Sequence, residues 1–243
     1  MTKKKRIKMK EYDDALKFWD NLFAKDESSA DDFSPEKLVF KDEKIMAEIE
    51  KIAHQSKILD YGCGQGILSF MLLNDGASSV TALEPSPKAI ECVRKVADLR
   101  GDGDRLVLLN GFQDMLDKYA DGAFDGFVSC NVLDVVPQPV CIDILEHVSR
   151  VLRPDTKGFI MLNSKPSEEF LEKRNAVLAK DENGNDIADH YVIGGVLRIV
   201  NKPDEFWLSL FRKYFKAEYV GEVDASFKGD EGSYPERLYV IEK

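Results

Sequence analysis

The 243-residue sequence has no apolar run close to the roughly 18 residues that a membrane-spanning helix needs. Its basic start, "MTKKKRIKMKEYDD", leads into no apolar stretch, so we expect neither a membrane span nor a secretory signal. The four cysteines form no CxxC pair and lie among apolar residues, which predicts buried, reduced thiols rather than disulfides or a metal site. These absences predict a cytoplasmic protein without a bound metal. The cysteines are Cys63, Cys92, Cys130 and Cys141.

Positive charge is scarce outside the first ten residues. The formal net charge is −10, yet those ten residues carry six basic side chains and no acidic one, which leaves −16 on the rest of the chain. An acidic body repels phosphate backbones, and this weighs against a nucleic-acid substrate. The basic segment is either a contact arm or a solvated, disordered terminus, and the second is more typical of such runs.

The central part of the sequence alternates short apolar runs with longer amphipathic ones. We predict strands at residues 57–61, 79–84, 106–110, 124–129 and 158–163. Helices are expected to begin near Ile67, Ser86, Gln113 and Gln138. Because strands that alternate with helices form right-handed βαβ units, the sequence predicts an α/β fold with a mostly parallel sheet.

The first 54 residues are predicted to form helices that cover the site, ahead of a main domain at 55–243. Apolar residues recur at helical spacing in 11–23, which indicates the first helix. The second is expected to have Ser34 as its cap and Pro35 as its first residue, and to reach the end of this region.

The C-terminal part departs from the strand–helix alternation. A helix is predicted at 203–215, followed by two strands at 216–227 and 234–243 that can pair as an antiparallel hairpin. An insertion at 164–200 contains the turn "DENGND" and a strand predicted at 190–200. Insertions of this length are often lids or binding loops, and a decorative hairpin is the alternative.

The segment "KILDYGCGQGILSF" holds three glycines spaced two apart, Gly62, Gly64 and Gly66, between a predicted strand and a predicted helix. Glycines there let the backbone turn sharply and lie against a ligand. The following helix presents free N–H groups. Asp60 precedes the loop, and its carboxylate would repel a pyrophosphate but attract a cation.

A second acid, Glu84, ends the next predicted strand. An acid about 20 residues beyond such a loop is well placed to accept hydrogen bonds from both hydroxyls of a ribose. Nicotinamide-binding folds need the pattern GxGxxG, but Ile67 occupies the place of its last glycine. The form GxGxG with a preceding acid fits a sulfonium nucleoside instead.

Four segments in order, "LDYGCGQG", "ALEPS", "FDGFVSCNVLDVVP" and "VSRVLRPDTKGFIML", resemble the landmark segments of class I S-adenosylmethionine-dependent methyltransferases. The resemblance covers roughly residues 57–163 and includes the terminal hairpin. It implies a Rossmann-like, doubly wound, mostly parallel seven-stranded sheet closed by an antiparallel C-terminal β-hairpin. It also implies S-adenosyl-L-methionine as the cofactor and S-adenosyl-L-homocysteine as the product.

The resemblance assigns roles to individual residues. Asp60 and the backbone of Gly62 and Gly64 would hold the methionine part of the cofactor. Glu84 would bind the ribose, and Pro85 would lie against the adenine. The remaining positions that the resemblance places at the cofactor are Cys63 and Gly66 in the loop, and Cys130 and Asn131 after the fourth strand.

Two of these contacts need comment. The carbonyl of Cys130 would accept from the methionine ammonium, with Asn131 alongside. In the family an acid usually holds the adenine edge, but Phe112 or Gln113 stands at its place here. Asp114 lies close enough to substitute for that acid.

The sequence says less about the acceptor, since the cofactor itself supplies the electrophile. Asp134 and His190 are candidates for a general base, although Asp134 could instead cap the helix near Pro137. The side chains expected to bind the substrate are Tyr12, Trp19, Tyr191 and Arg198.

The acceptor expected from charge and composition is a small molecule. No N/D-P-P-Y segment or Pro-Cys nucleophile follows the fourth strand, which weighs against adenine, glutamine and cytosine C5 acceptors. Methylation of tRNA or protein remains the alternative within the family. A fold relative that binds the nucleoside without catalysis is the alternative outside it.

Overall fold

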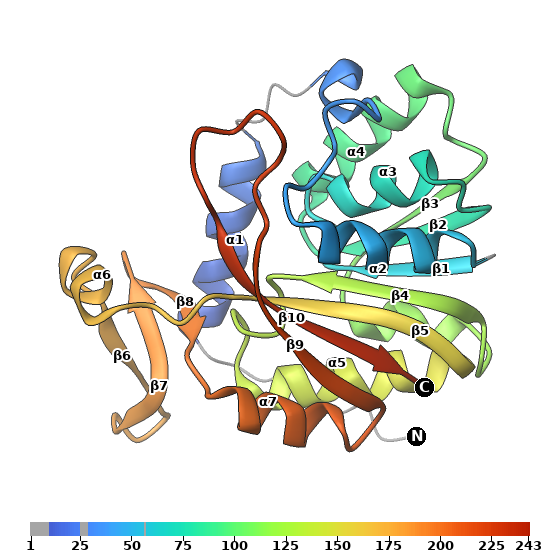
Figure 1. The fold of residues 1–243 in the computed structure, drawn as a ribbon. Helices are drawn as coiled ribbons and strands as arrows, with labels where there is room; N and C mark the ends of the chain where they lie inside the picture. Colours follow the sequence, from blue (N-terminus) through green and yellow to red (C-terminus); the bar gives the residue numbers. More distant parts are fainter. Residues whose placement is uncertain (1–9, 25–28, 56) are drawn as a thin grey trace.

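The computed structural model describes residues 10–24, 29–55 and 57–243, so most of the basic N-terminal segment lies outside the described residues. A seven-stranded sheet with the order β3-β2-β1-β4-β5-β10-β9 runs through the centre of the molecule (Figure 1). Its strands are β1 (Lys57–Tyr61), β2 (Ser79–Glu84), β3 (Leu106–Asn110), β4 (Phe124–Cys130), β5 (Leu152–Asn163), β9 (Lys216–Asp224) and β10 (Pro235–Glu242).

Helices cover both faces of this sheet (Figure 1). Successive side chains of a strand point to opposite faces, so Ile58 and Leu59 of β1 enter two different cores. The core around Ile58 includes side chains of α2 (Glu43–Ala53), α3 (Ile67–Asn74) and α4 (Pro87–Arg100). The core around Leu59 includes side chains of α5 (Gln138–Val151) and α7 (Asp204–Phe211). Burial on both faces explains why the central strands are apolar along their length.

Strand pairing confirms the fold expected from the sequence. β1 pairs in parallel with β2 and β4, and β4 pairs in parallel with β5. β10 runs antiparallel to both β5 and β9, and its register sets Glu236 opposite Asn163. The sheet is therefore doubly wound and mostly parallel, with an antiparallel C-terminal hairpin.

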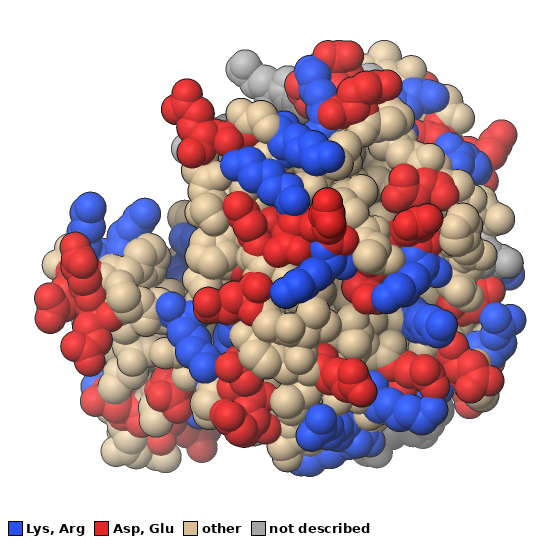
Figure 2. Space-filling view, viewed as in Figure 1, with Lys and Arg blue, Asp and Glu red and all other residues tan. Residues whose placement is uncertain are grey.

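Charged side chains of both signs are mixed over the surface. On the face seen in Figure 2, Lys and Arg side chains lie among Asp and Glu side chains rather than in one continuous basic area. Elsewhere in the described residues, exposed charges are paired, such as Lys37 with Asp31 (2.6 Å) and Lys88 with Glu91 (3.1 Å). Exposed pairs of this kind contribute little to stability, and mixed charge of this kind is typical of a solvated surface.

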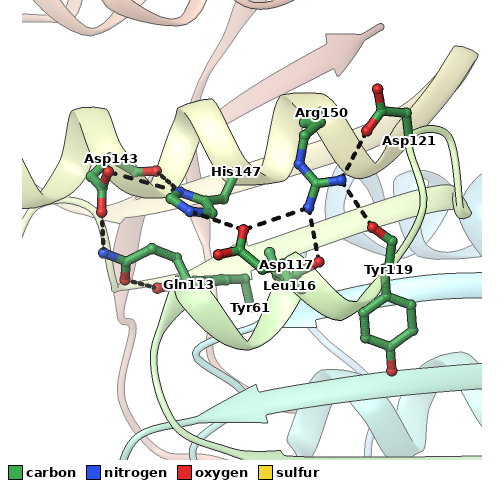
Figure 3. Close-up of polar contacts among 9 residues, drawn as sticks. All are labelled: Tyr61, Gln113, Leu116, Asp117, Tyr119, Asp121, Asp143, His147 and Arg150. Carbon is green, nitrogen blue, oxygen red and sulfur yellow. Dashed lines mark hydrogen bonds and ion pairs between the residues drawn. The ribbon is translucent and has the colours of Figure 1, made fainter. Parts of the chain in front are cut away.

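The helix expected to begin near Gln113 does begin there, but it is short. That segment is a six-residue 3-10 helix, η2 (Gln113–Lys118). Its last carbonyls are held from α5, since the Arg150 guanidinium donates to the carbonyls of Leu116 and Tyr119, both at 2.9 Å (Figure 3). These hydrogen bonds pair backbone carbonyls that further turns of helix would otherwise pair. The helix can therefore end after one short stretch.

The second N-terminal helix also differs from the expectation. Ser34 does not begin a helix; it follows the short 3-10 helix η1 (Ala30–Phe33), and α2 begins only at Glu43, where the Asp42 side chain accepts from the Lys44 N–H at 2.9 Å. The chain between them is drawn into other pairing, because residues 39–41 hydrogen-bond to residues 226–228 of the C-terminal hairpin. The capping signal at Ser34 and Pro35 is therefore not used, because pairing with a segment distant in sequence fixes the chain that follows it.

The insertion folds as a small sheet of three antiparallel strands, β6 (Val177–Lys180), β7 (Asp186–Ile193) and β8 (Val196–Val200), preceded by α6 (Glu168–Lys173). The single strand expected at 190–200 is wrong, because the chain reverses at Gly194 and Gly195, whose φ angles are +63° and +83°. Positive φ at two successive positions matches a tight hairpin turn, which glycine adopts without steric cost.

The first helix, α1 (Lys10–Phe23), lies beside this small sheet and packs on β8 and α4 (Figure 1). The last predicted helix is shorter than expected, since α7 ends at Phe211 rather than at residue 215. None of the helices in the described ranges is long and apolar enough to cross a bilayer.

Candidate active site

The glycine loop after β1 adopts a conformation that only glycine enters freely. Gly62, Gly64 and Gly66 have φ angles of +74°, +51° and +83°, all in the left-handed region. The Gly62 N–H donates to the Leu83 carbonyl at 2.8 Å, which ties the loop to β2. A Cβ on Gly62 would lie 2.2 Å from Cγ2 of Val132, so the loop also needs glycine for space. The loop therefore packs against the segment after β4 more closely than a side chain on Gly62 would allow.

A cavity of about 660 Å³ opens at the carboxyl ends of β1, β2 and β4 and continues under α1. Ligands in open α/β sheets bind at this edge. The volume of the cavity is also in the range of small-molecule sites. Of the predicted site residues, those that line the cavity are Tyr12, Trp19, Asp60, Gly62, Cys63, Gly64, Glu84, Pro85, Phe112, Cys130, Asn131 and Arg198. Those outside the lining are Gly66, Gln113, Asp134, His190 and Tyr191.

Two buried carboxyl groups stand at the cavity floor. One oxygen of Glu84 accepts from the Gly64 N–H (3.1 Å) and the other from the Ser86 N–H (2.9 Å). Asp60 accepts from the Ser69 hydroxyl at 2.6 Å. Burial raises the pKa of Glu84 to about 6 and that of Asp60 to about 7. Burial destabilises the charged form of these carboxyl groups. A ligand that brings hydroxyl donors and positive charge would stabilise that form, so the site favours such a ligand.

The adenine side of the predicted site is only partly as expected. Phe112 lines the cavity, whereas Gln113 and Asp114 do not. The Tyr61 hydroxyl donates to Oε1 of Gln113 (3.1 Å), and Nε2 of Gln113 donates to the Asp143 carboxylate (2.6 Å), as Figure 3 shows. Both ends of the Gln113 amide are therefore used to join β1 to α5. Of the three residues considered for the adenine edge, only Phe112 lines the cavity.

Comparison with known proteins decides the family. The model of a methyltransferase domain matches residues 58–155, which hold the glycine loop, Glu84 and the β4 end. Residues 58–155 form a methyltransferase domain, and they are similar to S-adenosylmethionine-dependent methyltransferases. The resemblance inferred from the four sequence segments is thereby confirmed, as is S-adenosylmethionine as the cofactor of this family.

Individual methyltransferases are similar over parts of the chain. The mitochondrial ubiquinone biosynthesis O-methyltransferase of Schizosaccharomyces pombe is 42% identical over 94 residues, or 39% of this chain and 29% of the relative. Ribosomal protein L11 methyltransferase of Thermosynechococcus vestitus is 34% identical over 102 residues, or 42% of this chain and 31% of the relative. The matched part of the chain thus spans about a third of these relatives.

The fold likeness extends further than the sequence likeness. A solved structure of an S-adenosylmethionine-dependent methyltransferase from Methanosarcina mazei aligns with a TM-score of 0.60 at 19% identity. The alignment covers 80% of this chain and 96% of that one. At this identity the agreement concerns the fold, and it extends beyond the cofactor motifs.

The residues that line the cavity fit the cofactor. The Oδ1 atom of Asn131 is buried and has no hydrogen-bond partner among the described residues. Asn131 follows Cys130, whose carbonyl is the expected acceptor for the methionine ammonium. The unpaired Oδ1 of Asn131 therefore lies where the ammonium group of the cofactor is expected to bring hydrogen-bond donors. On the opposite side, the paired oxygens of Glu84 retain lone pairs for ribose hydroxyls.

Asp134 lies behind the cavity wall rather than in it. Its carboxylate is buried and accepts from the backbone N–H (2.8 Å) and the side-chain Nδ2 (3.0 Å) of Asn163, which does line the cavity. Burial raises its pKa to about 6. The suggestion that it caps the helix near Pro137 is wrong, because α5 has Pro137 at its cap and no side-chain cap bond. Asp134 positions Asn163.

His190 and Tyr191 sit on β7, outside the cavity lining. The Nδ1–H of His190 donates to the Ala188 carbonyl (2.9 Å), and burial lowers the pKa of the imidazole. Arg198 on the neighbouring β8 does reach the cavity. The hairpin therefore presents Arg198 rather than the two β7 side chains to the site.

Helix α1 closes the cavity through contacts that sequence analysis missed. The Asp20 carboxylate accepts from the Ser86 hydroxyl (2.7 Å) and the Lys88 N–H (3.1 Å), which joins α1 to the start of α4 beside Glu84. One residue earlier on the helix, the Arg198 guanidinium lies 4.7 Å from the ring centre of Trp19. An acid on the polar side of an amphipathic helix gives no sequence signal that distinguishes it from a solvated one.

Cys63 fills space rather than reacting. Burial raises the pKa of its thiol well above the usual value, so the reactive thiolate is suppressed. All four cysteines are free, with Cys63 and Cys141 buried and Cys92 and Cys130 partly buried.

Proposed function

We propose that the protein transfers a methyl group from S-adenosylmethionine to a small-molecule acceptor by in-line displacement. The observation that supports this most directly is the cavity of about 660 Å³, which lies over the glycine loop and beneath α1. Its volume is typical of small-molecule sites and leaves room for a compact acceptor beside the cofactor. We also propose a cytoplasmic location, supported by the four free thiols.

The chain's own residues would bind and orient the cofactor. Glu84 would accept from the ribose hydroxyls, while the Gly62–Gly64 backbone and the Cys130 carbonyl would hold the methionine end. When bound, S-adenosylmethionine supplies an electrophilic methyl group on a sulfonium. The protein has to hold an acceptor in line with that group and exclude water, and orientation of this kind lowers a barrier by about 7–11 kcal/mol.

Several features support a small acceptor over a macromolecule. The part of the cavity beneath α1, where the acceptor would lie, is lined mostly by apolar side chains. Helix α1 covers this part instead of leaving an open groove. The mixed surface charge in Figure 2 and the acidic body do not resemble a phosphate-binding surface. The name of the S. pombe relative also describes an O-methyltransferase of a biosynthetic pathway.

A protein acceptor is the second candidate. The T. vestitus relative is named for methylation of a ribosomal protein, and its identity to this chain is only slightly lower. A flexible peptide end can enter a cavity that a folded surface cannot. A fold relative without catalysis remains a third candidate, since one fold hosts many functions.

Labelled cofactor separates these candidates. Tritiated S-adenosylmethionine should be incubated with the protein and an extract of the cells that produce it, and the products separated by size. We expect label in the small-molecule fraction. Label in protein or RNA would favour a macromolecular acceptor, and an unlabelled extract together with tight S-adenosylhomocysteine binding would indicate a non-catalytic protein.

A further inference from the structure

Glu236 brings a carboxyl group to the acceptor side of the cavity from an unexpected element. It is the second residue of β10, which runs antiparallel to β5. Because of that direction, the beginning of β10 lies at the same edge of the sheet as the ends of the parallel strands. Glu236 is paired with Asn163, and both side chains line the cavity.

Hydrogen bonds hold the Glu236 carboxyl group in one place. Nδ2 of Asn131 donates to Oε1 at 2.6 Å, and the Cys130 thiol donates to Oε2 at 3.5 Å. Each oxygen thus has one protein partner and keeps lone-pair capacity for another donor. The carboxyl group contacts the residues that follow β4, next to the expected methionine end of the cofactor.

The cavity that Glu236 lines also has an apolar, partly aromatic wall. The rings of Phe40 and Phe227 stack with centroids 4.7 Å apart, and both residues line the cavity together with Met161. An aromatic wall in the same cavity as the Glu236 carboxyl group suits a flat, weakly polar molecule with a hydrogen-bond donor.

The other cavity acids are already committed. Asp60 accepts from Ser69, and Glu84 accepts from the two backbone N–H groups at the cofactor floor. Glu236 is held instead by Cys130, the last residue of β4, and by Asn131 directly after it. Asp134, which the sequence suggested as a base, does not line the cavity.

We propose that Glu236 is the general base that takes the proton of an acceptor hydroxyl group, and this proposal rests on the methyl transfer proposed above. The hydroxyl proton passes to a Glu236 oxygen while the acceptor oxygen forms its bond to the methyl carbon. The electron pair of the broken carbon–sulfur bond stays on sulfur, which becomes a neutral thioether. Glu236 then releases the proton to water.

We infer a hydroxyl acceptor rather than an amine because a general base is needed to remove a hydroxyl proton. A neutral hydroxyl is a poor nucleophile until its proton leaves, whereas a neutral amine attacks without a base and loses its proton afterwards in water. A buried carboxyl group kept near the reacting centre is therefore more useful for oxygen than for nitrogen.

The protonation of Glu236 agrees with this role. Burial raises its pKa to about 7, the bonds from Asn131 and Cys130 oppose this rise, and the negative charge of Asp134 adds to it. A base with a pKa near the working pH is both available and strong enough to act. The other titratable and charged groups around this cavity are Asp60, Tyr61, Cys63 and Glu84 on its floor, Cys130 at the end of β4, Tyr12, Lys17 and Asp20 on α1, and Arg198 on β8.

The test uses Glu236→Gln, with Glu236→Asp as the conservative variant and Glu218→Gln, an exposed position on β9, as the control. Affinity for S-adenosylhomocysteine is measured by calorimetry, and folding by thermal unfolding. Transfer from tritiated S-adenosylmethionine to the small-molecule fraction of the producing cells' extract is followed from pH 5.5 to 9.

We expect the rate of the unmodified protein to rise with pH and to level off above about 7, as a base with this pKa requires. Glu236→Gln should be slower by about 100-fold or more and lose the rising limb, with S-adenosylhomocysteine affinity changed less than about threefold. Glu236→Asp should recover part of the rate together with the limb, and the control should match the unmodified protein.

Other outcomes overturn the proposal in different ways. An unchanged rate and pH profile in Glu236→Gln would leave methyl transfer standing but remove the base. A loss of S-adenosylhomocysteine affinity of tenfold or more would make Glu236 a ligand of the cofactor. Label on nitrogen instead of oxygen would contradict the hydroxyl acceptor. No transfer by the unmodified protein would refute the proposed function, and this inference with it.

Discussion

Replacing Gly62 by alanine tests why the loop after β1 contains glycine. The φ angle of +74° costs a residue with a Cβ roughly 1–2 kcal/mol. In addition, the new Cβ would lie 2.2 Å from Cγ2 of Val132. Overpacking of this kind costs about 1–3 kcal/mol, and valine has only one side-chain torsion with which to escape. The free energy of unfolding should fall by about 2–5 kcal/mol.

Gly101 provides a control that separates the two costs. It ends α4 with the same φ of +74°, but a Cβ there would meet nothing within 4 Å. Gly101→Ala should therefore lose only the conformational part, roughly 1–2 kcal/mol. Urea unfolding of both variants measures the difference directly, provided that unfolding is two-state.

Val132→Ala completes the comparison. Combined with Gly62→Ala, it removes the atom that the new Cβ would strike, so the double variant should recover much of the packing loss. The reasoning would be refuted by equal losses in Gly62→Ala and Gly101→Ala, or by strict additivity of the Gly62 and Val132 changes. In the single Gly62→Ala variant, any displacement of Val132 into the cavity should also weaken S-adenosylhomocysteine binding.

Three other perturbations have defined outcomes. Because burial raises the pKa of Asp60 to about 7, its ionisation lowers stability as pH rises from about 4 to 7, and Asp60→Asn should gain about 1–4 kcal/mol in urea unfolding at pH 8 but nothing at pH 4. A gain of equal size at both pH values would contradict this. Glu84→Gln should weaken S-adenosylhomocysteine binding by about 1–3 kcal/mol in calorimetry, because one oxygen can no longer accept; unchanged affinity would remove Glu84 from the ribose site. Arg198→Ala should speed hydrogen exchange in α1, because the stacking on Phe18 and Trp19 is lost, and unchanged exchange would show that this stacking does not stabilise the helix.

The cofactor side of the site was predictable because its determinants are local in sequence. Three glycines, the acid before them and the acid about 20 residues later follow from one βαβ unit, whose geometry varies little. The strands at 57–61, 79–84 and 106–110 begin and end where apolar runs predict them. Burial on both faces makes such runs conspicuous.

Non-local pairing accounts for what was missed. Ser34 and Asp42 are both good helix caps, and the choice between them follows from the bridge between Phe40 and Phe227. Glu236 is recognisable as a strand residue, but its position at the cavity depends on the register of β10 against β5, which no local pattern specifies. The hairpin at Gly194 and Gly195 did have a local signal, the pair of glycines, that the strand prediction passed over.

The bridge between residues 39–41 and 226–228 has a consequence for biosynthesis. A ribosome that has translated the chain only as far as Asn163 has synthesised every cofactor motif, yet Phe227 and Glu236 still lie ahead in translation. The cavity wall that joins Phe40 to Phe227 can close only when the last strands emerge. Contacts of such long sequence separation slow folding, so the nascent protein passes through a stage with a formed nucleoside floor and an open acceptor side. A truncated chain arrested at that stage should still bind S-adenosylhomocysteine weakly but have no enclosure for an acceptor.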